Sequence, residues 1–154
     1  MQEPLINVVA AAIVDDLNRP TRLLAARRSA PAALAGRWEF PGGKLEPGED
    51  HLAALHRELD EELGVTVAVG AELPGPDGGV WPITSKHRMR VWFARLQDGV
   101  PEPLEDHDEL RWLTAAELDD VPWLEGDVQI VEALAQHLRP IPETEPGRDR
   151  TAAK

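Results

Sequence analysis

The chain of 154 residues contains no cysteine. Without thiols it can form neither a disulfide framework nor a thiolate metal site. It also lacks any apolar run long enough to cross a membrane as a helix. Its first residues do not include the positive segment that opens a signal peptide. We therefore expect a cytoplasmic protein with no membrane partner.

Basic residues are scarce compared with acidic ones, 16 Lys and Arg against 28 Asp and Glu, which gives a formal charge of −12. Such a chain is a poor binder of duplex nucleic acid, because the phosphates would be repelled. A phosphorylated small molecule can still bind where divalent cations invert the local field. Seven of the acids lie between Glu46 and Glu62, so the negative charge is concentrated where a cation would be useful.

The length and the apolar pattern predict one domain over residues 1–139. Residues 140–154 are rich in proline and charge, without apolar periodicity, and we expect a disordered tail there. Strands are predicted on both sides of a central helix, with a second helix near the end, which gives an α+β layered architecture. The predicted strands are residues 6–14, 22–26 (as the hairpin partner of the first), 38–40, 65–73, 84–96 and 109–113, and the last helix is 128–138.

The central helix is predicted over residues 51–63. Asp50 precedes it as a candidate N-cap, and Gly64 follows it in the position where a left-handed backbone costs glycine little. At 100° per residue, four leucines form one narrow stripe that should face the core, Leu52, Leu55, Leu59 and Leu63.

Three acids lie beside this stripe on the same helix, Glu58, Glu61 and Glu62. Close carboxylates repel one another, and Arg57, four residues before Glu61, relieves only part of that repulsion. A hard divalent cation would relieve more, and oxygen ligands suit Mg²⁺ or Mn²⁺. The alternative is a solvated acidic helix face stabilised by charge pairs.

The string WEFPGGK ends immediately before the acidic stretch. Paired glycines, Gly42 and Gly43, let the backbone approach a ligand closely and expose a carbonyl to it. Lys44 adds a positive point charge that can meet a phosphate. Taken alone, the glycines are equally compatible with an ordinary turn.

Residues 43–65 fit the pattern G-x5-E-x7-R-E-U-x-E-E-x-G-U, where U is apolar, at every fixed position. In this the chain resembles the Nudix hydrolases, and WEFPGGK resembles their MutT-like branch, which hydrolyses nucleoside triphosphates. The resemblance runs from about Ile6 to about Leu138 and implies an α/β/α sandwich around a mixed β-sheet. It also implies the roles of the motif residues: metal ligation by Glu58, Glu61, Glu62 and the Gly42 carbonyl, orientation of these acids by Arg57, and support of the loop by Glu49.

Further site residues follow from the resemblance. The family often adds one acid six residues before a strand tryptophan, which indicates Asp106 before Trp112, with Glu105 as a rival and a solvated acidic loop as the alternative. His107, beside it, is interpreted as a surface histidine without a special role. The expected nucleotide contacts are Arg28 and Lys44, Asp127 at the start of the last helix (as base contact, N-cap or both), and Trp81 and Trp123 as stacking surfaces.

The expected reaction is Mg²⁺-dependent hydrolysis of a nucleoside triphosphate to the monophosphate and pyrophosphate, as in sanitation of the nucleotide pool. The candidate substrates are oxidised or modified dNTPs such as 8-oxo-dGTP, and (d)CTP-type nucleotides. The alternatives are an ADP-ribose or other nucleoside-diphosphate-X hydrolase, and a nucleotide-sensing module without turnover. Either a monomer or a homodimer is compatible with the sequence.

Overall fold

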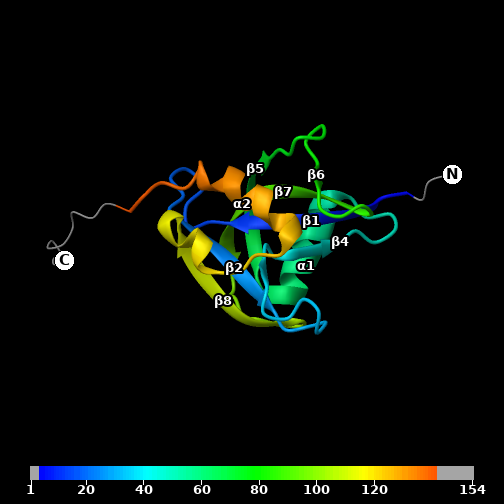
Figure 1. Cartoon of the computed structure of the whole chain (residues 1–154), viewed down its shortest axis with the longest axis horizontal. Coiled ribbons are helices and arrows are strands. Elements are labelled where there is room, and N and C mark those ends of the chain that lie inside the picture. The colour runs from blue at the N-terminus through cyan, green and yellow to red at the C-terminus, as the bar shows by residue number, and fades with distance from the viewer. Residues whose placement is uncertain (1–3, 142–154) are drawn as a thin grey trace, which may run out of the picture.

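The structure, a computed structural model, describes residues 4–141. Most of the predicted tail, residues 142–154, lies outside the described residues. The elements shown in Figure 1 are β1 (Ile6–Ile13), β2 (Arg22–Arg28), β3 (Trp38–Glu39), β4 (Gly42–Lys44), α1 (His51–Leu63), β5 (Thr66–Leu73), β6 (Trp81–Pro82), β7 (His87–Asp98), β8 (His107–Thr114), two short 3₁₀ helices (Ala115–Asp120 and Glu125–Asp127) and α2 (Val128–Ala135). None of the helices in this part of the chain is long and apolar enough to span a membrane.

The strands form two sheets. The first has the order β4-β1-β7-β5, with β6 paired to β7, and it is mixed because β1 and β7 run parallel while the other pairs are antiparallel. The second has the order β3-β2-β8 and is antiparallel. The predicted α+β class with a mixed sheet and flanking helices is confirmed.

Strand β1 is covered on both faces. Val9, Ala11 and Ile13 belong to the apolar cluster beneath α1. The alternate residues Ala10 and Ala12 belong to the other cluster, which includes residues of α2 and of the second sheet. Burial on both sides accounts for the continuous apolar run of this strand, because a half-exposed strand would alternate with polar residues.

The predicted hairpin between residues 6–14 and 22–26 is wrong. β1 lies between β4 and β7 and has no free edge, so β2 joins the second sheet, and a single bridge between Val14 and Leu23 connects the two strands. At the turn, the Asp15 carboxylate accepts hydrogen bonds from the amides of Thr21 (2.8 Å) and Arg22 (3.1 Å). This turn directs the chain out of one sheet and into the other.

The central helix begins and ends where the sequence predicts. The Asp50 carboxylate accepts a hydrogen bond from the Ala53 amide at 2.8 Å, and Gly64 has a φ of 72°. Three leucines of the predicted stripe are fully buried, Leu55, Leu59 and Leu63. The fourth, Leu52, is 41% exposed. It lies in the first turn, ahead of the buried residues that pack on the sheet, so helical spacing alone gave the wrong prediction for it.

The two ends of this stripe should therefore differ in their effect on stability. Leu59→Ala should lower the free energy of unfolding by about 2–5 kcal/mol, because it removes buried contacts and leaves a cavity. Leu52→Ala, the same change on the same helix face, should cost less than about 1 kcal/mol. Urea denaturation of both variants measures the difference, and equal losses would contradict the packing described.

Candidate active site

Two of the three helix acids, Glu58 and Glu62, lie against the glycine pair of β4. Glu62 accepts a hydrogen bond from the Gly42 amide at 3.1 Å. The Glu58 carboxylate packs so closely on Gly43 that a methyl group there would overlap it. At Gly42 a methyl group would overlap the backbone of Val9 and Ala10, so close approach requires glycine there, whereas at Gly43 the flexible Glu58 side chain could shift.

Arg57 is the hub of the acidic cluster. Its guanidinium forms a two-bond pair with Glu49, from Nε at 2.7 Å and from Nη2 at 2.9 Å. Nη1 donates to Glu58 at 3.1 Å and to Glu61 at 3.2 Å. Nη2 also donates to the Lys44 carbonyl at 3.1 Å. One side chain thus ties the loop after β4 to the acids of α1.

The pKa values of these acids are shifted in opposite directions. The hydrogen bonds from Arg57 lower the pKa of Glu49 to about 2. Burial raises the pKa of Glu62 to about 8; the charges of Glu39 and Glu58 add to this, while His107 and the Gly42 amide oppose it. Burial also raises the pKa of Glu58, although Arg57 opposes the shift. The site therefore holds buried carboxyls that are costly to ionise unless a cation is near.

The donor set fits a hard divalent cation, because carboxylate oxygens and backbone carbonyl oxygens are the ligands such ions prefer. Among residues 4–141, however, no three acid or imidazole groups converge on one point at metal-binding distance. Arg57 lies between Glu58 and Glu61 and bonds to both. Each carboxylate has one oxygen that Arg57 does not bond, Oε1 of Glu58 and Oε2 of Glu61, so a shared cation requires these acids to move closer together.

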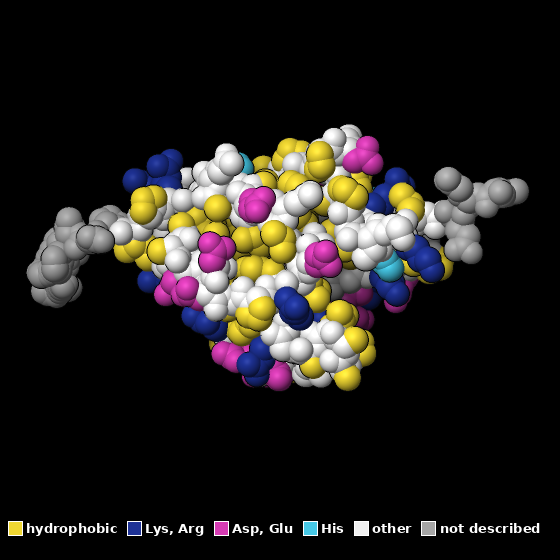
Figure 2. Space-filling view, viewed as in Figure 1, with side chains coloured by type: hydrophobic (Ala, Val, Ile, Leu, Met, Phe, Trp, Pro, Cys, Tyr) yellow, Lys and Arg dark blue, Asp and Glu magenta, His cyan; other side chains and the backbone are white. Residues whose placement is uncertain are grey.

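A cleft of about 250 Å³ opens beside the glycine pair. It brings together four of the predicted site residues, Arg28, Gly42, Lys44 and Asp127. Its remaining lining is mostly apolar, with Glu39 and His87 as the other ionisable groups: Val8, Val9, Ala10, Phe40, Gly43, Ile83, Met89 and Leu124. On the face that carries α2, Figure 2 shows hydrophobic side chains in the centre with acidic and basic ones spread around them.

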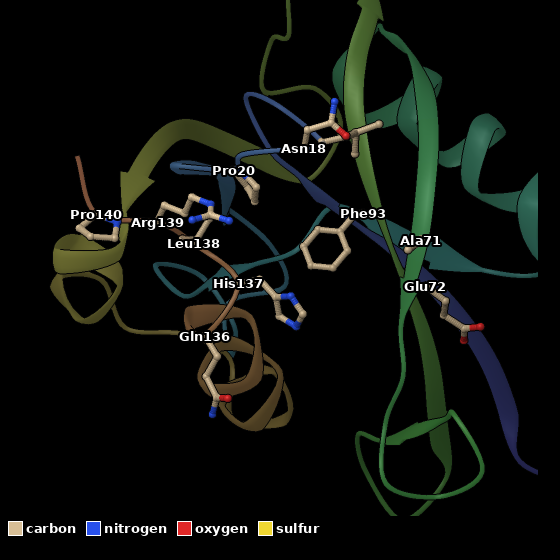
Figure 3. A pocket seen from close by; sticks show the side chains of 11 residues that line it. Asn18, Pro20, Ala71, Glu72, Phe93, Gln136, His137, Leu138, Arg139 and Pro140 are labelled. Carbon is tan, nitrogen blue, oxygen red and sulfur yellow. The ribbon is translucent and has the colours of Figure 1, made fainter. Parts of the chain in front are cut away.

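A larger cavity, about 600 Å³, lies elsewhere (Figure 3). It is formed between the end of α2, the β1–β2 turn and strands β5 and β7. The rings of Phe93 and His137 approach there to 5.3 Å between centroids. None of the predicted site residues lines this cavity, so the smaller cleft is the candidate active site.

Asp127 lies on the floor of the small cleft. It occupies the N-cap position of α2, as predicted, but its side chain makes no capping hydrogen bond. The carboxyl instead turns inward and accepts a hydrogen bond from the Phe40 amide at 3.3 Å. Burial and the charge of Glu39 raise its pKa to about 7. A buried carboxyl of this kind can accept or donate a hydrogen bond near neutral pH.

The two tryptophans predicted as stacking surfaces lie in the core instead. Trp81 is 6% exposed and Trp123 is 7% exposed, and neither lines the cleft. Their ring N–H groups donate to backbone carbonyls, of Leu73 at 3.0 Å and of Leu118 at 2.7 Å. The ring of Trp123 stacks on Phe40, a cleft residue, at 5.5 Å. Trp123 therefore supports the cleft wall from behind and does not offer an open face.

The two candidate acids of the loop before β8, Glu105 and Asp106, have different surroundings. Asp106 is 64% exposed, and its nearest basic partner is Arg28, at 3.8 Å. The charge of Glu105 contributes to the raised pKa of Glu58, so Glu105 is within electrostatic reach of the helix acids. Glu105 also has a φ of 53°, a left-handed conformation uncommon outside glycine.

His107 and Glu39 are the site residues that the sequence interpretation missed. The His107 side chain is only 1% exposed, so the expected surface histidine is wrong. Its Nε2 lies 2.7 Å from Glu39, which also accepts from Arg28 at 2.9 Å. β8 begins at His107, two residues earlier than predicted, which turns the ring inward. For Glu39 the signal was its place in WEFPGGK, on a short strand next to the glycines.

Comparisons with known proteins identify the family of this chain. A family model described as NUDIX domain matches residues 6–134. The chain is 45% identical over 134 residues to a Mycobacterium tuberculosis protein provisionally named 8-oxo-dGTP diphosphatase 2, with 85% of this chain and 89% of that protein covered. It is 36% identical over 132 residues to the CTP pyrophosphohydrolase of Escherichia coli, covering 84% and 90%. Among solved structures, a MutT NUDIX hydrolase from Burkholderia pseudomallei aligns with a TM-score of 0.67 at 28% identity, covering 90% and 100%.

The buried carboxyl of Glu62 should make stability depend on pH. Its pKa in the folded chain, about 8, lies above the ordinary value of 4.5. Between these values the folded chain keeps a proton that the unfolded chain releases, so rising pH favours unfolding. Without divalent metal, the native chain should lose on the order of 3 kcal/mol between pH 5 and pH 9 relative to Glu62→Gln.

Urea denaturation of both proteins at the two pH values measures this difference. Glu132→Gln, at an exposed position of α2, is the control and should follow the native curve. Parallel curves for the native chain and Glu62→Gln would contradict the burial assigned to this carboxyl.

Proposed function

This chain belongs to the MutT-like branch of the Nudix hydrolases, and from that membership we propose that it hydrolyses a nucleoside triphosphate to the monophosphate and pyrophosphate. One observation carries the proposal. Glu58 and Glu62 of α1 are packed on Gly42 and Gly43, which line a cleft that also contains Arg28, Lys44 and Asp127. Polyphosphate chemistry and nucleoside recognition can therefore take place side by side.

Nudix enzymes typically use a divalent metal, and here we propose Mg²⁺, with Mn²⁺ as a substitute. The residues that would hold it are Glu58, Glu61, Glu62 and the Gly42 carbonyl, with Glu105 or Asp106 as an additional acid. When bound, the cation would neutralise the polyphosphate and polarise the anhydride bond under attack. The raised pKa of Glu62 means that it would have to release its proton before it could act as a ligand.

The remaining charged residues prepare the site. Arg57 holds Glu58 and Glu61 close together before a cation arrives, and its two-bond pair with Glu49 fixes its own position. Lys44 and Arg28 line the cleft and offer positive charge to the phosphates. A helix or loop carboxylate would take the proton of the attacking water. Most of the rate would then come from positioned charge and not from a covalent intermediate.

The base would enter the apolar part of the cleft and meet Asp127. This carboxyl can accept from an exocyclic amine, or donate when it is protonated. The relatives named above favour two candidate substrates, 8-oxo-dGTP and (d)CTP-type nucleotides, with nucleotide-pool sanitation as the cellular role. A cytoplasmic location and a monomeric or homodimeric state belong to the same proposal.

The first test is turnover of a nucleotide panel with Mg²⁺. The native chain should release pyrophosphate from a nucleoside triphosphate, and Glu61→Gln should reduce kcat at least about 100-fold, because a charged group at the reacting phosphates is lost. Asp60→Asn, the neighbouring exposed acid of α1, should retain native kcat. Release of AMP and ribose phosphate from ADP-ribose alone, or nucleotide binding without turnover, would refute the proposed reaction.

A second test distinguishes the two acids of the loop before β8. The charge of Glu105 acts on Glu58, whereas Asp106 is exposed and lies toward Arg28. We therefore expect Glu105→Gln to raise the Mg²⁺ concentration for half-maximal activity about tenfold and Asp106→Asn to raise it less than about twofold. Magnesium titrations of initial rates measure both values, and the reverse order would identify Asp106 as the additional ligand.

A further inference from the structure

We propose that Glu39 is a positioning residue for the substrate, which acts together with His107 by fixing the guanidinium of Arg28 in the cleft. The inference rests on the proposed function, since it assigns how a nucleotide is held at that same site. It adds two residues, Glu39 and His107, that the Nudix motif of residues 43–65 does not contain.

The three side chains come from three adjacent strands of the second sheet, Arg28 from β2, Glu39 from β3 and His107 from β8. One oxygen of Glu39, Oε2, meets both partners, Nη1 of Arg28 at 2.9 Å and Nε2 of His107 at 2.7 Å. All three side chains are less than one-fifth exposed. Charge-assisted hydrogen bonds shielded in this way hold a side chain more firmly than exposed ion pairs do.

The backbone of β2 is shaped for this arrangement. The register between β2 and β8 shifts between Arg27 and Arg28, so that Arg28 stands opposite His107. Such bulges re-aim a side chain. Arg27 keeps to the solvent side, where it pairs with Asp108 at 2.7 Å and Glu109 at 3.1 Å. Arg28, the next residue, turns into the cleft instead.

The hydrogen bonds of Arg28 leave part of its guanidinium for a ligand. Nε donates to the Ala30 carbonyl at 2.9 Å, and Nη1 donates to Glu39. Within residues 4–141, the acid nearest to Nη2 is the exposed Asp106, at 3.8 Å. Arginine has five N–H donors, so donors of Nη2 can address a substrate while Nε and Nη1 keep the group in place.

Glu39 and His107 hold different positions in this network. Arg28 and Glu39 both line the cleft, whereas His107 does not and supports Glu39 from behind. These hydrogen bonds order the arginine side chain before the substrate binds. Less conformational entropy is then lost on binding, which favours affinity. The printed partners of Arg28 do not include an acid of α1, so loss of this order should act mainly on substrate binding. The charges of Glu39 and His107 also act on Glu62, so kcat is compared at saturating Mg²⁺.

A double-mutant cycle tests the inference. Glu39→Gln keeps the shape but removes the charge, and Arg28→Ala removes the guanidinium. Each single variant should raise KM for the best nucleoside triphosphate about tenfold, with kcat changed less than about threefold. The double variant should be no worse than Arg28→Ala alone, because Glu39 acts through Arg28. His107→Leu should raise KM in the same way, and His107→Gln, which keeps an N–H donor, should recover part of the loss.

Asp108→Asn is the matched control, because it breaks the pair of Asp108 with Arg27 on the solvent side. This pair joins β2 and β8, the strands that carry Arg28 and His107. It should leave KM and kcat at native values. Urea denaturation identifies any variant that does not fold. In that case Arg28→Lys and His107→Gln, which change less of the network, form a milder cycle with the same expected non-additivity.

Binding of the nucleoside monophosphate, measured by calorimetry, separates this inference from the proposed function. If no triphosphate is hydrolysed but the effects of Glu39→Gln and Arg28→Ala on monophosphate affinity show the same non-additivity, the proposed reaction fails and the role of Glu39 stands. If turnover occurs and the KM effects of Glu39→Gln and Arg28→Ala multiply, or the losses fall on kcat alone, the inference is overturned. Absence of both turnover and nucleotide binding overturns both.

Discussion

The contacts of Arg57 are the interaction on which the candidate site depends. Its guanidinium joins Glu49 of the loop to Glu58 and Glu61 of α1, and it also bonds to the Lys44 carbonyl of β4. Like charges would otherwise drive the acids apart, so their proximity is maintained by one cation of the chain itself. The same contacts occupy one oxygen of Glu58 and one of Glu61, so Arg57 competes with a metal ion for part of the donor set.

A second constraint is the separation of the two sheets. β1 is enclosed between β4 and β7, so β2 must pair elsewhere, and it forms the second sheet with β3 and β8. The cleft lies where β4 of the first sheet comes close to β2 and β3 of the second, and residues of both sheets line it. Recognition groups such as Arg28 and Glu39 therefore lie on one sheet, while Gly42 and Lys44 lie on the other. The metal-binding and nucleoside-binding parts of the site meet at this boundary.

The local features of the site were predictable because neighbouring residues determine them. The cap at Asp50, the left-handed Gly64 and the acids of α1 follow from helical spacing and backbone preference, and the structure has them where the sequence indicates. The predictions from sequence were wrong where burial of a side chain depended on residues distant in the chain. Leu52 fits the apolar stripe but extends beyond the sheet, and Trp81 and Trp123 are covered by parts of the chain far from them in sequence.

The sequence by itself determined the family, the α1 acids and the glycine pair, because the motif is contiguous and its geometry is set within one helix and one loop. Only the tertiary structure decided that Asp127 turns inward and makes no capping hydrogen bond to α2, that His107 is buried on Glu39, and that Glu105 is within electrostatic reach of the α1 acids while Asp106 lies toward Arg28. These outcomes depend on the packing of one sheet against the other. Since burial and charge from that packing set the pKa values of Glu62 and Asp127, the chemistry of these carboxyls is a property of the fold.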